Sequence, residues 1–291
     1  METVTARGRI RRARIAEAVA RAVLGTMALG VVALAVFVLG YIVTRGIGAI
    51  DWTFLTDVPR DRGRAGGIYP VMMGTVYVTL ATAAFTLPVG VLAGVYLSEY
   101  APRNLTTRAI RLAITNMAGV PSIVYGLFGL AAFVLLAGIG RSILAAALTL
   151  TCMTLPVVIT TTEESLRQIP SDLRQASLAL GATRLRTIRK VVLPAAAPGI
   201  ITGSILGLAR AAGETAPILF TGAVFQMRRT PEDPLSQFMA LPYHIYAQVT
   251  SVPGWSPTLV WGTALVLVGG IGLVSVAAAA WRSARRRRVT W

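Results

Sequence analysis

The chain has very little of the chemistry that catalytic and metal-binding sites use. Its 291 residues include one cysteine and one histidine, and 14% of the residues are charged. The single cysteine, Cys152, excludes an intramolecular disulfide, and the single histidine, His244, excludes a metal site built from several imidazoles. No set of a nucleophile, a base and an acid emerges in the apolar part of the sequence. These absences argue against an enzyme.

The scarcity of lysine limits how the protein can be powered. Loops that cradle nucleotide phosphates have the form GxxxxGK[ST], in which a lysine is followed by serine or threonine. The only lysine is Lys190, and Val191 follows it. Such a loop therefore cannot exist here, and if nucleotide hydrolysis drives this protein, a separate polypeptide carries it out.

Apolar sequence is what the chain has in abundance. Hydrophobic residues make up 55% of it, and the mean hydropathy of +0.67 excludes a soluble globular domain. Runs of roughly 20 apolar residues are long enough to cross about 30 Å of hydrocarbon. We therefore expect an all-α polytopic membrane protein with six transmembrane helices, near Ala22–Val43, Tyr69–Leu97, Ile110–Leu136, Ile143–Thr162, Val191–Gly222 and Leu259–Trp281.

The net charge of +16 comes from arginines clustered in short segments at the ends of these spans. The clusters fall within residues 7–14, 103–108, 167–190 and 282–288. With six spans all four lie on one side, which the positive-inside rule makes cytoplasmic. We expect a basic N-terminal segment (1–21), a transmembrane domain (22–281) that includes a cytoplasmic segment (171–190), and a basic tail (282–291), with both termini cytoplasmic.

The cytoplasmic segment is predicted to form a short helix that ends in a tight turn. Pro170 breaks the preceding helix, Ser171 is a good N-cap, and Asp172 suits the positive end of the helix dipole. Gly181 can adopt the left-handed conformation that ends a helix. The pattern gives a small apolar face, formed by Leu173, Ala176 and Leu180. It fits docking of a partner and contact with lipid headgroups equally well.

The fifth span carries two charges that need partners in an apolar environment. Arg210 and Glu214 are four residues apart and should share one face of a helix. A stripe of small residues lies within about 80° of that face and allows another helix to approach closely. It consists of Gly199, Gly203 and Gly207. We expect this face, with its buried ion pair, to point at a subunit interface.

The third span contains a region that can bend. Pro121 lacks a backbone donor, and three glycines between residues 119 and 129 weaken a regular helix. Ser122 and Tyr125 are polar groups that could line a path through the membrane. The alternative is a kinked packing helix whose hydroxyls bond to their own backbone.

Parts of the sequence resemble a known family. The series Gln175-Ala176-Ser177, Gly181, Leu193-Pro194 and Pro198-Gly199 is similar to the EAA loop of ABC importer permeases, although Gln175 and Ser177 depart from that pattern. In that family the loop forms the coupling helix that sits in a cleft of the ATP-binding subunit. The stretches 118–129 and 209–217 resemble phosphate importer permeases of the PstA type, and this second resemblance covers nearly the whole chain.

The resemblance implies a type I ABC importer permease in the bacterial inner membrane that translocates inorganic phosphate and is not itself an enzyme. Arg210 would then contribute positive potential to the anion pathway, with Glu214 holding it in place. The implied partners are a second permease of the PstC type, two ATP-binding subunits of the PstB type and a phosphate-binding protein of the PstS type. ATP and Mg²⁺ would be bound by the ATPase subunits, and this chain would bind no cofactor.

Three alternatives remain at this point. The cargo could be another oxyanion, such as molybdate or sulfate, since those permeases share the EAA loop. The chain could be a secondary transporter or channel, which would more typically show an internal repeat or paired broken helices. The Arg210–Glu214 pair could also be purely structural, fixing two helices without touching substrate.

Overall fold

The computed structural model describes the backbone of residues 2–61, 64–225, 227 and 229–286, and the side chains between residues 14 and 283 of those ranges. The arginine side chains at positions 7–12 and 285–288 therefore lie outside the described part of the chain. The described part is mostly helical, which confirms the predicted all-α membrane fold. Its strands are two residues each, Pro59–Arg60 (β1) and Ala65–Gly66 (β2), paired antiparallel.

Five described helices are long and apolar enough to cross a membrane. They correspond to five of the predicted spans. Helices α1 and α12 extend beyond the predicted bounds at both ends and α6 at its C-terminal end, whereas α3 and α9 do not. Their bounds are α1 (Glu2–Gly46), α3 (Tyr69–Val95), α6 (Ile143–Arg167), α9 (Leu193–Ala212) and α12 (Pro257–Arg286). The π-helical turn η3 (Tyr96–Tyr100) continues α3, and the turn η5 (Ile188–Val192) leads into α9.

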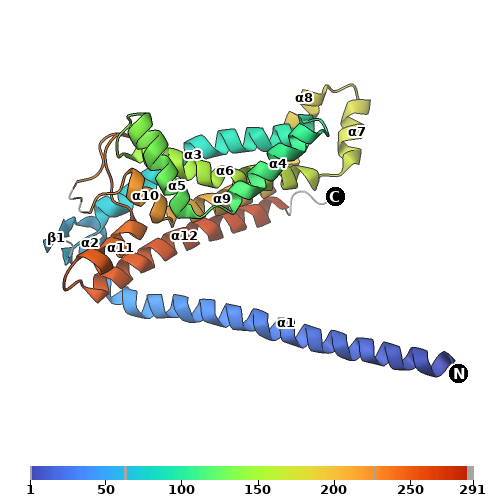
Figure 1. Cartoon of the computed structure of the whole chain (residues 1–291), viewed down its shortest axis with the longest axis horizontal. Coiled ribbons are helices and arrows are strands. Elements are labelled where there is room, and N and C mark those ends of the chain that lie inside the picture. The colour runs from blue at the N-terminus through green and yellow to red at the C-terminus, as the bar shows by residue number, and fades with distance from the viewer. Residues whose placement is uncertain (1, 62–63, 226, 228, 287–291) are drawn as a thin grey trace.

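The predicted third span, Ile110–Leu136, is not a single helix. Helix α4 (Leu105–Ala118) is followed by α5 (Ser122–Gly129) and the π-helical η4 (Leu130–Leu136), and the two halves meet at an angle of 102°. Pro121, with φ −58° and ψ 140°, precedes α5 in extended backbone that no helix can continue through. The predicted ability to bend is thus realised as a complete break, visible as a V in Figure 1.

The predicted fifth span, Val191–Gly222, is also too long. Helix α9 ends at Ala212 with Gly213 as its C-cap, and the short helix α10 (Ala216–Thr221) begins separately after Thr215. Pro217 occupies the first turn of α10, where its missing N–H removes no helical hydrogen bond. The sequence predicted continuous helix here because the apolar composition does not change across the break.

Helix α6 lies at the centre of the helical body, with α3 and α9 against it. Both neighbours approach α6 through glycines. A Cβ added to Gly94 on α3 would lie 2.6 Å from Cβ of Thr162, and one added to Gly203 on α9 would lie 2.5 Å from Cβ of Thr161. Gly199 and Gly207 make the same kind of contact with the Ser165 and Thr154 side chains of α6. The glycine stripe therefore packs inside the chain, and the expectation that it points at another subunit is wrong.

Helix α1 diverges from the rest of the molecule (Figure 1). It joins the body at its Gly46 end, where Gly46 packs on the backbone of Trp261 in α12. The apolar stretch that could span a membrane, Arg14–Ala49, is not buried by the described residues. One end of the molecule holds the N-terminal end of α1 and the C-terminal end of α12. The segments α7 (Ser171–Ala179) and α8 (Arg184–Thr187) lie toward the same end.

The opposite end of the molecule is built from η1 (Ile47–Ala49), α2 (Trp52–Thr56), the strand pair and α11 (Leu241–Ser251). On α11, Tyr243 is buried in the core while Tyr246 is exposed. His244 is also buried on α11, and burial lowers its pKa from 6.5 to about 4, so the imidazole is neutral at pH 7.

We predict that Gly203→Ala weakens the packing of α9 on α6. The new methyl group would overlap Thr161, and overpacking of this kind costs about 1–3 kcal/mol. Gly269→Ala in α12 is the matched control, because no atom lies within 4 Å of its added Cβ and alanine favours helix by about 1 kcal/mol over glycine. The measurement is the thermal unfolding midpoint of the purified full chain. Equal midpoints for the two variants would contradict the packing account.

Candidate functional site

The segment between α6 and α9 forms the predicted short helix and a second helical turn. Helix α7 begins at Ser171, with Asp172 in its first turn as expected. The cap itself differs from the prediction: Pro170 holds the N-cap position, and the Ser171 hydroxyl contacts the Asp172 carboxylate at 3.2 Å. Helix α8 starts after Thr183, whose hydroxyl accepts from the backbone N–H of Arg186 as an N-cap should.

Gly181 makes the turn between the two helices. Its φ is +78°, in the left-handed region that residues with a Cβ rarely adopt, which confirms the predicted helix terminator. The N–H of Gly181 donates to the carbonyl of Leu178, and the N–H of Ala182 donates to the carbonyl of Ser177. The hydroxyls of Ser177 and Thr187 then join the two arms at 2.9 Å. The result is a compact, internally fixed projection.

The tip of this projection carries exposed apolar side chains. Leu180 is 89% exposed, and Leu178 and Leu185 are exposed beside it. Of the motif residues, Gln175 and Ala176 are exposed on α7, whereas Ser177 is half-buried by its contact with Thr187. The predicted apolar face is therefore divided: Leu173 turns partly inward, and Leu180 is left without cover by the described residues.

Arg210 and Glu214 come together, but not as the sequence predicted. Arg210 is in the last turn of α9, and Glu214 lies beyond the end of that helix. Their side chains meet across the break, with 3.5 Å between Arg210 Nε and Glu214 Oε1. Arg210 is 51% exposed and Glu214 is 16% exposed. The expected buried pair on one helix face is thus a half-exposed pair that spans a helix end.

Tyr125 and Ser122 lie on α5, just after the 102° break. The Tyr125 hydroxyl donates to the carbonyl of Met117 on α4 at 2.9 Å, so it ties the two halves of the broken span together. Tyr125 is buried. Ser122 is half-buried in the first turn of α5. Tyr125 therefore fits the alternative of a kinked packing helix, because its hydroxyl is bonded to a backbone carbonyl of the same chain.

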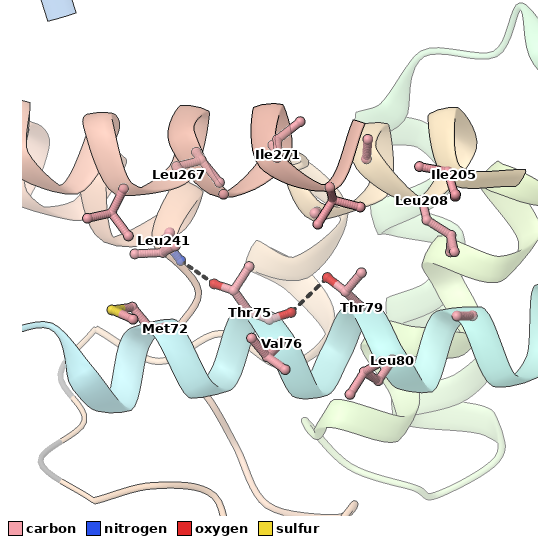
Figure 2. A pocket seen from close by; sticks show the side chains of 16 residues that line it. Met72, Thr75, Val76, Thr79, Leu80, Ile205, Leu208, Leu241, Leu267 and Ile271 are labelled. Atoms are coloured by element: carbon pink, nitrogen blue, oxygen red, sulfur yellow. Dashed lines mark hydrogen bonds between the residues drawn. The ribbon is translucent and has the colours of Figure 1, made fainter. Parts of the chain in front are cut away.

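A cavity of about 420 Å³ opens between α3, α9 and α12 (Figure 2). Its walls are apolar apart from two threonines. Thr79 donates to the carbonyl of Thr75, while Thr75 donates to the carbonyl of Val71 and accepts from the N–H of Leu241. These hydroxyl protons are already engaged, so the cavity offers no free donor to an anion. It is suited to hydrocarbon and not to a charged cargo.

Sequence reasoning missed Glu99, in the turn η3 that ends α3, and its partner Arg174 on α7. Glu99 ends an apolar span next to a basic segment, which is a detectable signal, and it forms an ion pair with Arg174 at 2.9 Å. Among the described residues, no group of three histidine, cysteine, aspartate or glutamate side chains lies close enough together to hold a metal ion.

A polytopic helical body that projects a short helix–glycine–helix segment at one end has the architecture of a transport permease. Residues 86–286 match the family model described as binding-protein-dependent transport system inner membrane component. The chain belongs to this family, the membrane-spanning permeases of ABC importers.

Two relatives of known name match most of the chain. It is 35% identical over 285 residues to the phosphate transport system permease protein PstA 1 of Mycobacterium tuberculosis, covering 96% of this chain and 92% of the relative. It is 36% identical over 245 residues to the probable ABC transporter permease protein YqgI of Bacillus subtilis, covering 84% and 83%. The predicted resemblance to PstA-type permeases is confirmed.

Solved structures of importers share the fold. A chain of the MetNI methionine ABC transporter, described as inward facing, aligns with a TM-score of 0.59 at 23% identity, covering 72% of this chain and 92% of its own length. A bacterial ABC transporter involved in the import of alginate aligns with a TM-score of 0.56 at 10% identity, covering 80% and 81%. Both confirm the predicted type I importer architecture.

We predict that Tyr125→Phe loosens the junction of α4 and α5. The change removes the hydrogen bond to Met117 and leaves the ring in place, which costs about 0.5–1.5 kcal/mol. Tyr96→Phe is the control, because Tyr96 is exposed on η3. Thermal unfolding of the purified chain should show a lower midpoint for Tyr125→Phe alone, and identical midpoints would mean that the hydroxyl contributes nothing to the bend.

Proposed function

We propose that this chain is one permease subunit of an importer that moves inorganic phosphate across a bacterial inner membrane, driven by separate ATPase subunits. The observation that carries the proposal is the projection formed by α7 and α8. It is fixed by the Gly181 turn and presents exposed leucines, including Leu180, at one end of the membrane body. A projection of this kind can transmit force from a partner to α6 and α9, which it joins.

Phosphate is the cargo that the combined observations favour. Arginine recognises phosphate oxygens through its planar set of donors and keeps its charge at all relevant pH values. Arg210 is half-exposed and only partly neutralised by Glu214, so it can act on an anion and still release it. Relatives that match most of the chain are named as phosphate transport permeases. Molybdate and sulfate are the competing oxyanions.

The arrangement of the ends supports a specific orientation. The N-terminal end of α1, the end of α12 and the α7–α8 projection lie toward one end of the molecule (Figure 1). We assign this end to the cytoplasm because the described arginines of the projection, such as Arg174, Arg184 and Arg186, lie there. One of two ATP-binding subunits, which hold ATP and Mg²⁺, would meet the projection. A phosphate-binding protein would dock at the opposite end, and a second permease would cover the half-exposed Arg210 and complete the path.

Arg210→Gln tests the cargo and the pathway together. We expect phosphate uptake in cells that lack other phosphate importers to fall at least tenfold, while the ATPase subunit still co-purifies in normal amount. Sulfate and molybdate should not compete with phosphate in the wild type.

Glu214→Gln separates an electrostatic role of Arg210 from a structural one. It removes the ion pair while keeping the arginine, so uptake should be retained if the positive charge is what matters. Equal loss of uptake and assembly in both variants would make the pair structural, and normal uptake in Arg210→Gln would remove this residue from the pathway.

Gly181→Val should uncouple ATP hydrolysis from transport. No atom lies within 4 Å of an added Cβ, so the Cβ itself causes no clash. It strains the positive φ by about 1–2 kcal/mol and so shifts the turn. Gly181→Asn is the control, since asparagine tolerates this conformation. The readout is phosphate moved per ATP hydrolysed in reconstituted vesicles. Normal stoichiometry in the valine variant would contradict coupling through this turn.

A further inference from the structure

One guanidinium joins the projection to the ends of two spans. Arg174 on α7 donates from Nη1 to the carbonyl of Ile169 at 2.6 Å and from Nη2 to the carbonyl of Leu166 at 2.7 Å. These carbonyls lie at the end of α6, where helical partners run out. The same Nη2 donates to the carboxylate of Glu99 at 2.9 Å. Arg174 therefore connects α7 to α6 and, through Glu99, to the end of α3.

The end of α3 is held from the other arm of the projection as well. Arg184 on α8 donates to the backbone carbonyl of Glu99. Its guanidinium also lies over the ring of Tyr100, 5.0 Å from the centroid. Both arms of the Gly181 turn thus contact Glu99, and the α8 arm also contacts Tyr100.

Burial distinguishes the Glu99–Arg174 ion pair from an incidental surface contact. The Glu99 side chain is 9% exposed and the Arg174 side chain is 23% exposed. By contrast, the pair between Glu17 and Arg21 on α1 is 68% and 77% exposed. Exposed pairs contribute little, whereas removing one partner of a buried pair leaves a charge without compensation. The Glu99–Arg174 pair is therefore one that the folded chain depends on.

The chain connectivity shows why such a link is needed. Helix α7 follows α6 directly and leads through α8 into α9, so the backbone itself carries any movement of α7 to these two spans. Helix α3 has no such covalent connection, because Glu99 and Arg174 are 75 residues apart in sequence. Helix α3 packs on α6 through Gly94. Its terminal turn η3 lies beyond that contact and is joined to the projection through the side chains of Arg174 and Arg184.

We propose that the Glu99–Arg174 pair is the mechanical link that makes α3 move with α7 during the ATP-driven cycle. Arg174 is a positioning residue, acting through α3 and α6 with no contact to cargo or nucleotide. This inference rests on the proposed function, since it assumes that a partner ATPase moves α7.

Glu99→Gln tests the link while keeping the size of the side chain and an acceptor for Arg174. In reconstituted complexes we expect ATP hydrolysis within twofold of the wild type and phosphate moved per ATP lowered at least fivefold. Arg21→Gln, which breaks the exposed pair on α1, is the matched control and should leave both unchanged. Wild-type stoichiometry in Glu99→Gln would overturn the proposal. Loss of assembly together with hydrolysis would overturn it too, in favour of a structural pair.

A distance measurement provides a readout that a merely structural role would not change. Spin labels at Tyr96 and Ser171, both exposed, report the separation of η3 and α7 after Cys152→Ser. In the otherwise wild-type complex the distance should be the same with and without bound ATP. In Glu99→Gln it should change or broaden with nucleotide. A distance that stays fixed in both proteins would overturn the proposal.

Two precautions keep the test decisive. If Glu99→Gln halves the yield of complex, the double substitution Glu99→Gln with Arg174→Gln replaces it, because it leaves no unpaired buried charge, and the same outcomes apply. The wild-type complex is measured first. Absence of ATP-dependent phosphate uptake there would refute the proposed cargo, whereas the label distances do not depend on which cargo is moved.

Discussion

Close approach of α3 and α9 to α6 is the constraint on which the other features depend. In a bilayer the hydrophobic effect does not drive helices together, so packing relies on small residues that bring backbones near. Gly94 and Gly203 provide this on the two neighbours, and α6 contributes threonines whose hydroxyls bond to its own backbone, as Thr154 and Thr161 do. The hydroxyls of Thr154 and Thr161 can thus lie between helices with their donors satisfied. The buried Thr162 hydroxyl beside Gly94 is an exception, because no described residue bonds to it.

This packing positions the α7–α8 projection at one end of the helical body and the break after α9 at the other. At one end, α6 stops at Arg167 and the chain turns into α7, so the projection is held by the most enclosed helix of the described structure. At the other end of α9, the helix stops at Ala212 and leaves Arg210 and Glu214 facing each other across the break. A rigid centre that carries the α7–α8 projection at one end and a charged break at the other fits the proposed transmission of movement to an anion path.

Much of this fold was accessible from sequence, because span length, arginine clusters and the Gly181 turn are local signals. The breaks were not, since apolar composition continues through Pro121 and Gly213 while the backbone changes direction. The glycine stripe on α9 was recognised from the sequence. Its packing partner could not be recognised, because the sequence does not say whether a small-residue face meets α6 or another subunit. The Glu99–Arg174 pair joins residues far apart in the chain and needed the structure to be seen.

The central claim is that a separate ATPase drives this permease through the tip of the α7–α8 projection. A photo-reactive amino acid placed at Leu180 tests it most directly in the assembled complex, with Leu235, exposed in the segment before α11, as the comparison site. The account predicts cross-links to the ATPase subunit from Leu180 and none from Leu235. Cross-links from Leu180 only to lipid would contradict it and would make the projection an interfacial helix.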